Sequence, residues 1–210
     1  MPQRKEALKI SNSENLTPWQ NKRAREIQAR LSWLISEGKL NQENLKGRII
    51  DLGTGSGAGL VALRALGATQ AAGVENGSEL REALGKITEI PINAFEAFSP
   101  SEPLQQQEKI FLNISNEEFL KIVKEGRWDV GLVTCFWISY EPPIRQIEEV
   151  LIPGGQVIIT AVKDSSYLKE LAKKTNLETE IIEMPEKLKG RLVNDRFVLM
   201  GTKKEEGGGF

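Results

Sequence analysis

The sequence predicts an α/β fold, doubly wound, in which helices cover both faces of a mostly parallel sheet of seven strands. Short apolar runs alternate with amphipathic segments from residue 47 onward, as in repeated strand–helix units. A glycine-rich segment joins the first of these strands to the first helix. The alternation ends in two successive strands with no convincing helix between them. We therefore expect a C-terminal antiparallel hairpin that adds one reversed strand at the sheet edge.

Each strand is predicted from a short apolar run bounded by turn-forming residues. The predicted strands are residues 48–52, 71–75, 109–114, 129–134, 156–162, 178–184 and 196–202. The helices between them are predicted from apolar residues at helical spacing, often behind a capping residue. They are residues 59–66, 78–84, 144–151 and 166–174, with a further helix that ends at residue 123 and has Ser115 or Asn116 as its cap.

A helix is also predicted before the alternating pattern begins. Thr17 is a candidate N-cap, Pro18 suits the first helical position, and Gln20 lies three residues after the cap. Apolar residues then recur at helical spacing until Gly38. We expect this helix to lie across the main fold, with residues 1–16 as a frayed, polar start.

The length of 210 residues suits one domain with a sheet-centred core. We divide the chain into an N-terminal helical extension over residues 1–45, an α/β domain over 46–204 and a flexible tail over 205–210. Residues 90–107 interrupt the pattern with three prolines and a glutamine run. This insertion forms either a lid or a surface loop.

The composition excludes several kinds of site. The chain contains no histidine, so it provides no histidine base, no histidine metal ligand and no Ser–His–Asp triad. Cys135 is the only cysteine, which excludes an internal disulfide and a cysteine-built metal site. A net charge of −1 and a pI near 5.8 do not indicate a polyanionic partner. The sequence has no signal-peptide pattern and no membrane-spanning apolar run, so we expect a cytoplasmic protein with no metal.

Residues 49–59 carry the strongest functional signal. A buried strand runs into alternating glycines, and a helix opens directly after them. Glycines allow positive φ angles and a close backbone approach to a ligand, while a helix N-terminus offers unpaired N–H groups. A simple turn needs fewer glycines than this segment has. Nucleotide cofactors of several kinds use such a loop, and Gly53, Gly55 and Ala58 also fit the dinucleotide fingerprint.

Two carboxylates and a turn help to distinguish among these cofactors. Asp51 ends the first strand, where its charge would repel a diphosphate but would suit the ammonium group of a methionine moiety. Glu75 ends the second strand, where it can accept hydrogen bonds from ribose hydroxyls, a role that fits NAD equally well. The third feature is a Pro-Gly-Gly turn at residues 153–155, between a helix and a strand.

Four motifs in this order resemble those of the class I S-adenosylmethionine-dependent methyltransferases. The matching segments are residues 51–57, 73–75, 128–133 and 151–155. The terminal hairpin is similar to the reversed last strand of that family, and the resemblance covers residues 45–203. It implies a Rossmann-like fold, S-adenosyl-L-methionine as cofactor and methyl transfer as the reaction.

The resemblance also implies a set of cofactor-binding residues. The family has an adenine contact just after its third strand, and that turn falls on residues 115–117. Asn116 stands where the family commonly has aspartate, and its side-chain oxygen can still accept from an exocyclic amine. The cofactor-binding candidates are Asp51, Gly53, Thr54, Gly55, Gly57, Glu75, Ser115, Asn116 and Thr134.

Methyl transfer from a sulfonium needs alignment more than reactive side chains, because the leaving group is already activated. In the family, the groups that follow the fourth strand face the methyl group. Here those groups include Cys135, which we interpret as a buried apolar residue because the Pro-Cys context of carbon methyltransferases is absent. Phe136 is either a pocket wall or part of the core. The catalytic candidates are Trp137, Tyr140 and Glu141.

The acceptor is less well specified than the cofactor. The Asn/Asp-Pro-Pro-aromatic motif of the family's amino-group enzymes is absent after the fourth strand. With the acidic pI, this absence favours a small molecule or a protein side chain as acceptor. The alternatives are a nucleic-acid methyltransferase and a non-catalytic, cofactor-binding regulatory or scaffold protein. Trp19 on the N-terminal helix either covers the substrate or only packs.

Overall fold

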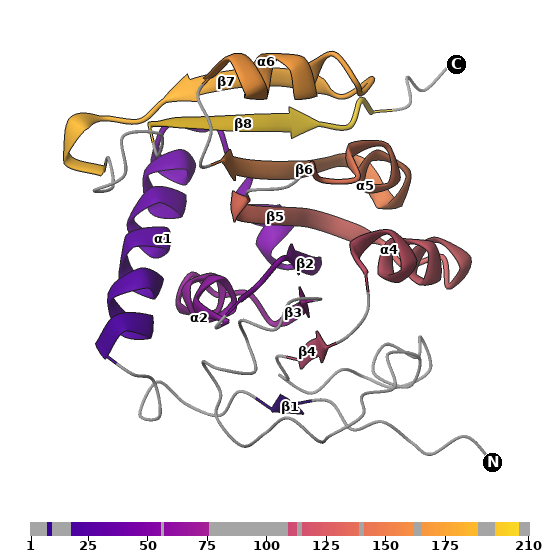
Figure 1. Cartoon of the computed structure of the whole chain (residues 1–210), viewed down its shortest axis with the longest axis horizontal. Coiled ribbons are helices and arrows are strands. Elements are labelled where there is room, and N and C mark those ends of the chain that lie inside the picture. Colours follow the sequence, from indigo (N-terminus) through magenta and orange to yellow (C-terminus); the bar gives the residue numbers. More distant parts are fainter. Residues whose placement is uncertain are drawn as a thin grey trace.

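The computed structural model describes residues 8–9, 18–55, 57–75, 109–112, 115–138, 141–161, 165–188 and 196–205. These residues form an α/β fold built on one mixed sheet (Figure 1). Its strands are β1 (Leu8–Lys9), β2 (Arg48–Leu52), β3 (Gln70–Glu75), β4 (Lys109–Leu112), β5 (Val130–Ile138), β6 (Leu151–Ala161), β7 (Glu178–Glu183) and β8 (Phe197–Thr202). The helices are α1 (Pro18–Ser36), α2 (Ala58–Ala65), α4 (Asn116–Glu125), α5 (Ile144–Val150) and α6 (Ser165–Ala172), with 3-10 turns η2 (Gln42–Leu45) and η4 (Glu186–Leu188).

The strand order is β1-β4-β3-β2-β5-β6-β8-β7. Strands β4, β3, β2, β5 and β6 pair in parallel, whereas β8 runs antiparallel to both β6 and β7. The predicted terminal hairpin is therefore present, with β7 at the edge. The described sheet has eight strands where the sequence predicted seven, because Leu8 and Lys9 pair antiparallel with β4 inside a segment expected to be frayed. This short strand satisfies backbone groups along what would otherwise be an exposed edge.

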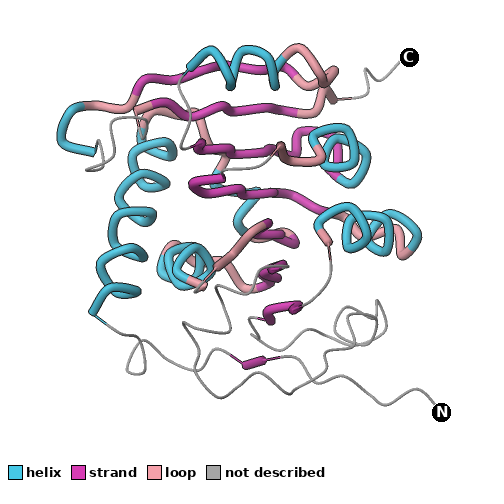
Figure 2. Tube along the Cα trace, viewed as in Figure 1, coloured by secondary structure: helices cyan, strands magenta, loops and turns pink. Residues whose placement is uncertain are grey.

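Apolar side chains cover both faces of the sheet. Alternate residues of β2 divide between two core clusters: Ile50 packs with α4, α5 and α6, whereas Ile49 packs with α1 and α2. Figure 2 shows the strands between α1 and α2 on one side and α4 and α5 on the other. A strand buried on both faces has no polar alternation, which is why the sequence shows short continuous apolar runs here.

Two strands extend beyond their predicted ends. Strand β5 was predicted to stop at residue 134 but continues to Ile138, because the apolar run goes on and pairs with β6 after a register shift. Strand β6 begins at Leu151, so the predicted Pro-Gly-Gly turn lies inside it. The irregularity is visible in the register, where Val130 pairs with Leu151 but Leu132 pairs with Gln156. Gly154 takes a φ of +74° at this bulge.

The predicted N-terminal helix is present as α1. Pro18 occupies its first position, and Gly38, with a φ of +67°, follows its end. Trp33 packs against the core cluster beneath the helix. Among the helices of the described residues, none combines the length with the apolar character that a membrane span requires. Several expectations lie outside the described residues: the N-cap Thr17, the helix at 78–84, the insertion at 90–107 and the last five tail residues.

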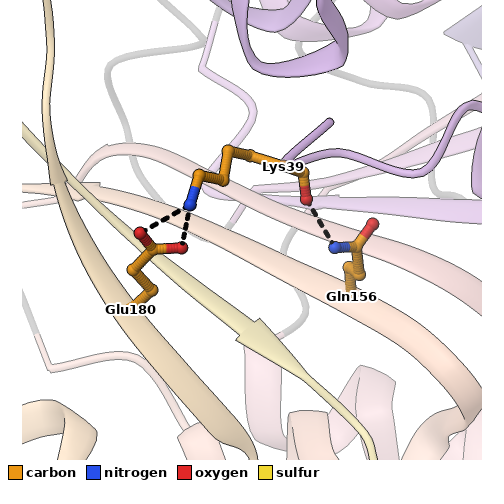
Figure 3. A network of polar contacts seen from close by, with 3 residues as sticks. All are labelled: Lys39, Gln156 and Glu180. Atoms are coloured by element: carbon orange, nitrogen blue, oxygen red, sulfur yellow. Dashed lines mark hydrogen bonds and ion pairs between the residues drawn. The ribbon is translucent and has the colours of Figure 1, made fainter. Parts of the chain in front are cut away.

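A buried amide fastens the end of the N-terminal extension to the sheet. The Gln156 side chain, 6% exposed, accepts hydrogen bonds from Asn41 N at 2.8 Å and Asn44 Nδ2 at 3.1 Å. Its Nε2 donates to the Lys39 carbonyl at 2.8 Å. Figure 3 shows this contact and the ion pair of Lys39 with Glu180 on β7. The backbone after α1 is thereby held against β6.

Candidate functional site

The loop after β2 is built from three glycines in the left-handed region. Their φ angles are +66° at Gly53, +53° at Gly55 and +80° at Gly57. Gly53 N and Thr54 N both donate to the Val74 carbonyl, at 2.8 and 3.1 Å, which holds the start of the loop on β3. Side chains with a Cβ are disfavoured at such φ angles, so the alternating glycines of the sequence match this backbone path.

The loop opens directly into α2. Gly57 is the N-cap residue and provides no side-chain hydrogen bond to the helix. A Cβ built on Gly55 would meet no atom within 4 Å, so there is space on that side of the residue. A helix N-terminus without a side-chain cap suits a ligand that accepts hydrogen bonds from amides.

Asp51 lies at the base of the loop and is buried. Its carboxylate accepts a hydrogen bond from the Thr54 hydroxyl at Oδ2 and another from the Thr134 hydroxyl at Oδ1, both at 2.7 Å. Only 2% of Asp51 is exposed. The sequence predicts this carboxylate in a ligand crevice, and that role stays a prediction. In the structure, the carboxylate lies between two threonine side chains.

Two glycines outside the loop make room for this carboxylate. A Cβ at Gly59, in the first turn of α2, would collide with Asp51 Oδ2. A Cβ at Gly73, which pairs with Asp51 across the sheet, would meet the Thr54 side chain at 2.7–2.9 Å. The sequence alone did not indicate why glycine is needed at these two positions, because packing between different elements determines which atoms lie next to them.

The remaining cofactor candidates follow the ends of neighbouring parallel strands. Glu75 is the last residue of β3, next to the loop strand β2. Ser115 caps α4, where its Oγ accepts from Glu118 N at 3.1 Å, as one of the two predicted caps. Asn116 begins α4 and is half-buried. Since the carboxyl ends of parallel strands share one edge, these residues and the glycine loop lie along the same side of the sheet.

The candidates after β5 divide into core and surface positions. Cys135 is fully buried as predicted, and burial together with the charge of Asp51 raises the pKa of its thiol well above the ordinary value. Phe136 packs in the core cluster under α1 and α2. Glu141 forms an exposed ion pair with Lys174 at 2.5 Å. Trp137 belongs to β5, but its side chain and all of Tyr140 lie outside the described residues.

The structure adds one aromatic hydroxyl that the sequence reasoning did not single out. Tyr167 lies in the first turn of α6, shortly after β6, and is partly buried against the core. Burial and the negative charge of Glu141 raise the pKa of its phenol. In the sequence, Tyr167 could have been identified by its position at the start of the helix that follows β6, the strand beside β5.

Comparison of the sequence with known proteins gives no match, either to a family model or to a curated protein. Comparison of the fold gives many. A proposed S-adenosylmethionine-dependent methyltransferase from Streptococcus mutans is 14% identical, with a TM-score of 0.53 over 76% of this chain and 46% of that protein. This chain thus spans about half the length of that protein.

For two further structures, the match with this chain extends over a larger share of the known protein. A tRNA methyltransferase from Aquifex aeolicus is 16% identical, with a TM-score of 0.51 over 93% of this chain and 72% of that one. A magnesium protoporphyrin IX methyltransferase from Synechocystis PCC 6803, solved with bound S-adenosylmethionine, is 12% identical, with a TM-score of 0.51 over 91% and 87%. The chain therefore has the fold of the class I S-adenosylmethionine-dependent methyltransferases.

Proposed function

We propose that this chain is an S-adenosylmethionine-dependent methyltransferase that acts on a small molecule or a protein side chain. One observation carries the proposal: on a methyltransferase fold, three left-handed glycines lead into a helix whose N-terminus has no side-chain cap. A Cβ on Gly55 would meet no atom within 4 Å, which leaves room for a bound nucleoside on that side of the residue.

The residues present fit the proposed cofactor. Glu75, the last residue of β3, would accept hydrogen bonds from the ribose hydroxyls. Asn116, at the start of α4, would accept from the adenine amine with its side-chain oxygen. The backbone of the glycine loop would contact the remainder of the ligand. When bound, the cofactor supplies a methyl group on a sulfonium, which is an activated leaving group.

The protein's own contribution is then orientation and exclusion of water. No histidine is present in the sequence to act as a base. Cys135 does not fit the role of nucleophile, because the buried thiol is neutral at physiological pH. Trp137 and Tyr140 are our proposed walls of the acceptor site. Glu141 suits a base less well than expected, because Lys174 already holds its carboxylate at the surface.

The acceptor class rests on two features of the sequence. The amino-group motif is absent after residue 134, and the pI near 5.8 does not favour a polyanion. A nucleic-acid acceptor is the second candidate, because the Aquifex aeolicus protein with a similar fold methylates tRNA.

The proposed activity is tested by transfer of label. Tritium from methyl-labelled S-adenosylmethionine should enter an acceptor in cell extract and should survive nuclease treatment. Fractionation by size then separates small molecules from proteins. Label that disappears with nuclease would identify nucleic acid as the acceptor instead. Tight binding of S-adenosylhomocysteine without transfer to any fraction would favour a non-catalytic, cofactor-binding protein.

The proposed role of Glu75 has its own test. Glu75→Ala removes the acceptor of two hydroxyl hydrogen bonds, so affinity for S-adenosylhomocysteine should fall by about 1.5–3 kcal/mol. The 2′-deoxyribose analogue should lose little further affinity in this variant, as measured by isothermal titration. If the variant discriminates against the analogue as strongly as the wild type does, another residue holds the ribose.

A further inference from the structure

Three buried polar side chains join the glycine loop to the centre of the sheet. Asp51 ends β2, Thr54 lies in the loop and Thr134 belongs to β5, the strand that pairs with β2. They are 2%, 7% and 0% exposed. The carboxylate accepts one hydroxyl on each oxygen, at 2.7 Å in both cases. The loop is thus connected through Asp51 to a strand 83 residues away in sequence.

The surroundings indicate that this arrangement is built to hold the carboxylate. A buried carboxylate is strongly disfavoured unless it is hydrogen-bonded, and here hydroxyl donors contact both of its oxygens. Gly59 and Gly73 keep side chains away from Asp51 and Thr54. Because the Thr54 side chain lies over Gly73 on β3, the start of the loop is held from two neighbouring strands.

We propose that Asp51, Thr54 and Thr134 form a positioning unit that fixes the glycine loop before a ligand binds. Asp51 then does not contact the methionine part of the cofactor. It holds Thr54, and so positions the backbone of the glycine loop, which contacts the cofactor. The inference about the ligand rests on the proposed function. The inference about the loop concerns the free protein and does not depend on it.

The first test measures the loop without a ligand. Thr134→Val keeps the shape of the side chain and removes one donor to Asp51. Amide hydrogen exchange in residues 51–59 should become faster by roughly tenfold, the loss expected for one hydrogen bond to a charged group. The matched control is Thr175→Val, which removes a part-buried 2.8 Å hydrogen bond from the Thr175 hydroxyl, after α6, to the Glu148 carboxylate on α5. Unchanged exchange in residues 51–59 of Thr134→Val would overturn the proposal.

The second test separates positioning from direct contact. S-adenosylhomocysteine carries the amino acid part, whereas 5′-methylthioadenosine lacks it. If Asp51 positions the loop, Thr134→Val and Asp51→Asn should each weaken both ligands by roughly tenfold or more. Thr134→Ser, which keeps the hydroxyl, should bind like the wild type. If Asp51 instead binds the ammonium group, Asp51→Asn would weaken only S-adenosylhomocysteine, and the positioning role would be wrong.

Outcomes for the wild type keep the two proposals distinct. A wild type that binds neither nucleoside contradicts the proposed function, and the hydrogen-exchange test of the loop still decides the positioning unit. A wild type that binds both, with unchanged affinity in Thr134→Val, supports the cofactor and rejects the positioning unit. Should Thr134→Val not fold, Thr54→Val removes the other donor and serves the same two measurements.

Discussion

At the scale of single residues, glycines of this chain serve two different physical needs. Gly55 and Gly67 have positive φ angles, of +53° and +94°, and a Cβ on either would meet no atom within 4 Å. Gly59 and Gly73 have no such φ angle but lie against the Asp51–Thr54 pair. Glycine is therefore required by backbone conformation in the first pair and by space in the second.

The first pair allows a matched test of the ligand site. Gly55→Ala and Gly67→Ala should each lower stability by about 1–2 kcal/mol, because both place a Cβ in the left-handed region. Only Gly55→Ala should also weaken S-adenosylhomocysteine, because Gly67 lies at the far end of α2. Thermal unfolding and isothermal titration provide the two readouts. Equal affinities in the two variants would mean that the ligand does not approach the loop at Gly55.

Arg127 occupies a position where a glycine would be more stable. It has a φ of +51° after the end of α4, while the preceding Gly126 is needed because a Cβ there would meet Trp128 Nε1 at 2.6 Å. Arg127→Gly should raise the free energy of unfolding by roughly 0.5–1 kcal/mol. Lys121→Gly, within the exposed face of the same helix, should lower it by about 1 kcal/mol. Denaturant unfolding measures both free energies. A less stable Arg127→Gly variant would show that the positive φ angle of Arg127 does not strain the backbone.

At the scale of elements, apolar runs predicted where strands form but not where they end. Strand β5 continues through Phe136 and β6 starts before its glycines, because pairing between the two strands decides both ends. The glycine loop could be predicted, since positive φ angles leave a local signal. The hydrogen bond from Thr134 to Asp51 could not, because Thr134 reaches Asp51 only through the parallel pairing of β2 with β5.

The attachment of the N-terminal extension can be tested at Gln156. Gln156→Leu would leave Asn41 N and the Lys39 carbonyl unpaired in a part-buried place, so stability should fall by about 2–4 kcal/mol. Lys39→Ala retains that carbonyl and removes only the exposed pair with Glu180, and should cost less than about 1 kcal/mol. Urea unfolding of the two variants is the measurement. Similar losses in both would mean that the buried amide adds little.

At the scale of the whole molecule, strand order positions the proposed site. Strands β2 and β5 lie beside each other although β3 and β4 intervene in sequence. From β2, the strands β3 and β4 extend the sheet to one side, whereas β5 and β6 extend it to the other. Ligands of open α/β sheets bind at the carboxyl edge near such a reversal of strand order. The alternation of strands and helices predicted a mostly parallel sheet covered on both faces, but it did not predict this strand order. The added strand β1 could not be predicted, because a two-residue pairing leaves no periodic signal.

The central claim is that this site takes an S-adenosyl nucleoside rather than a dinucleotide. Isothermal titration of the wild-type protein with S-adenosylhomocysteine and, separately, with NADH tests it most directly. We expect saturable binding of S-adenosylhomocysteine at one site per chain and no detectable heat from NADH. Binding of NADH with no binding of S-adenosylhomocysteine would contradict the account.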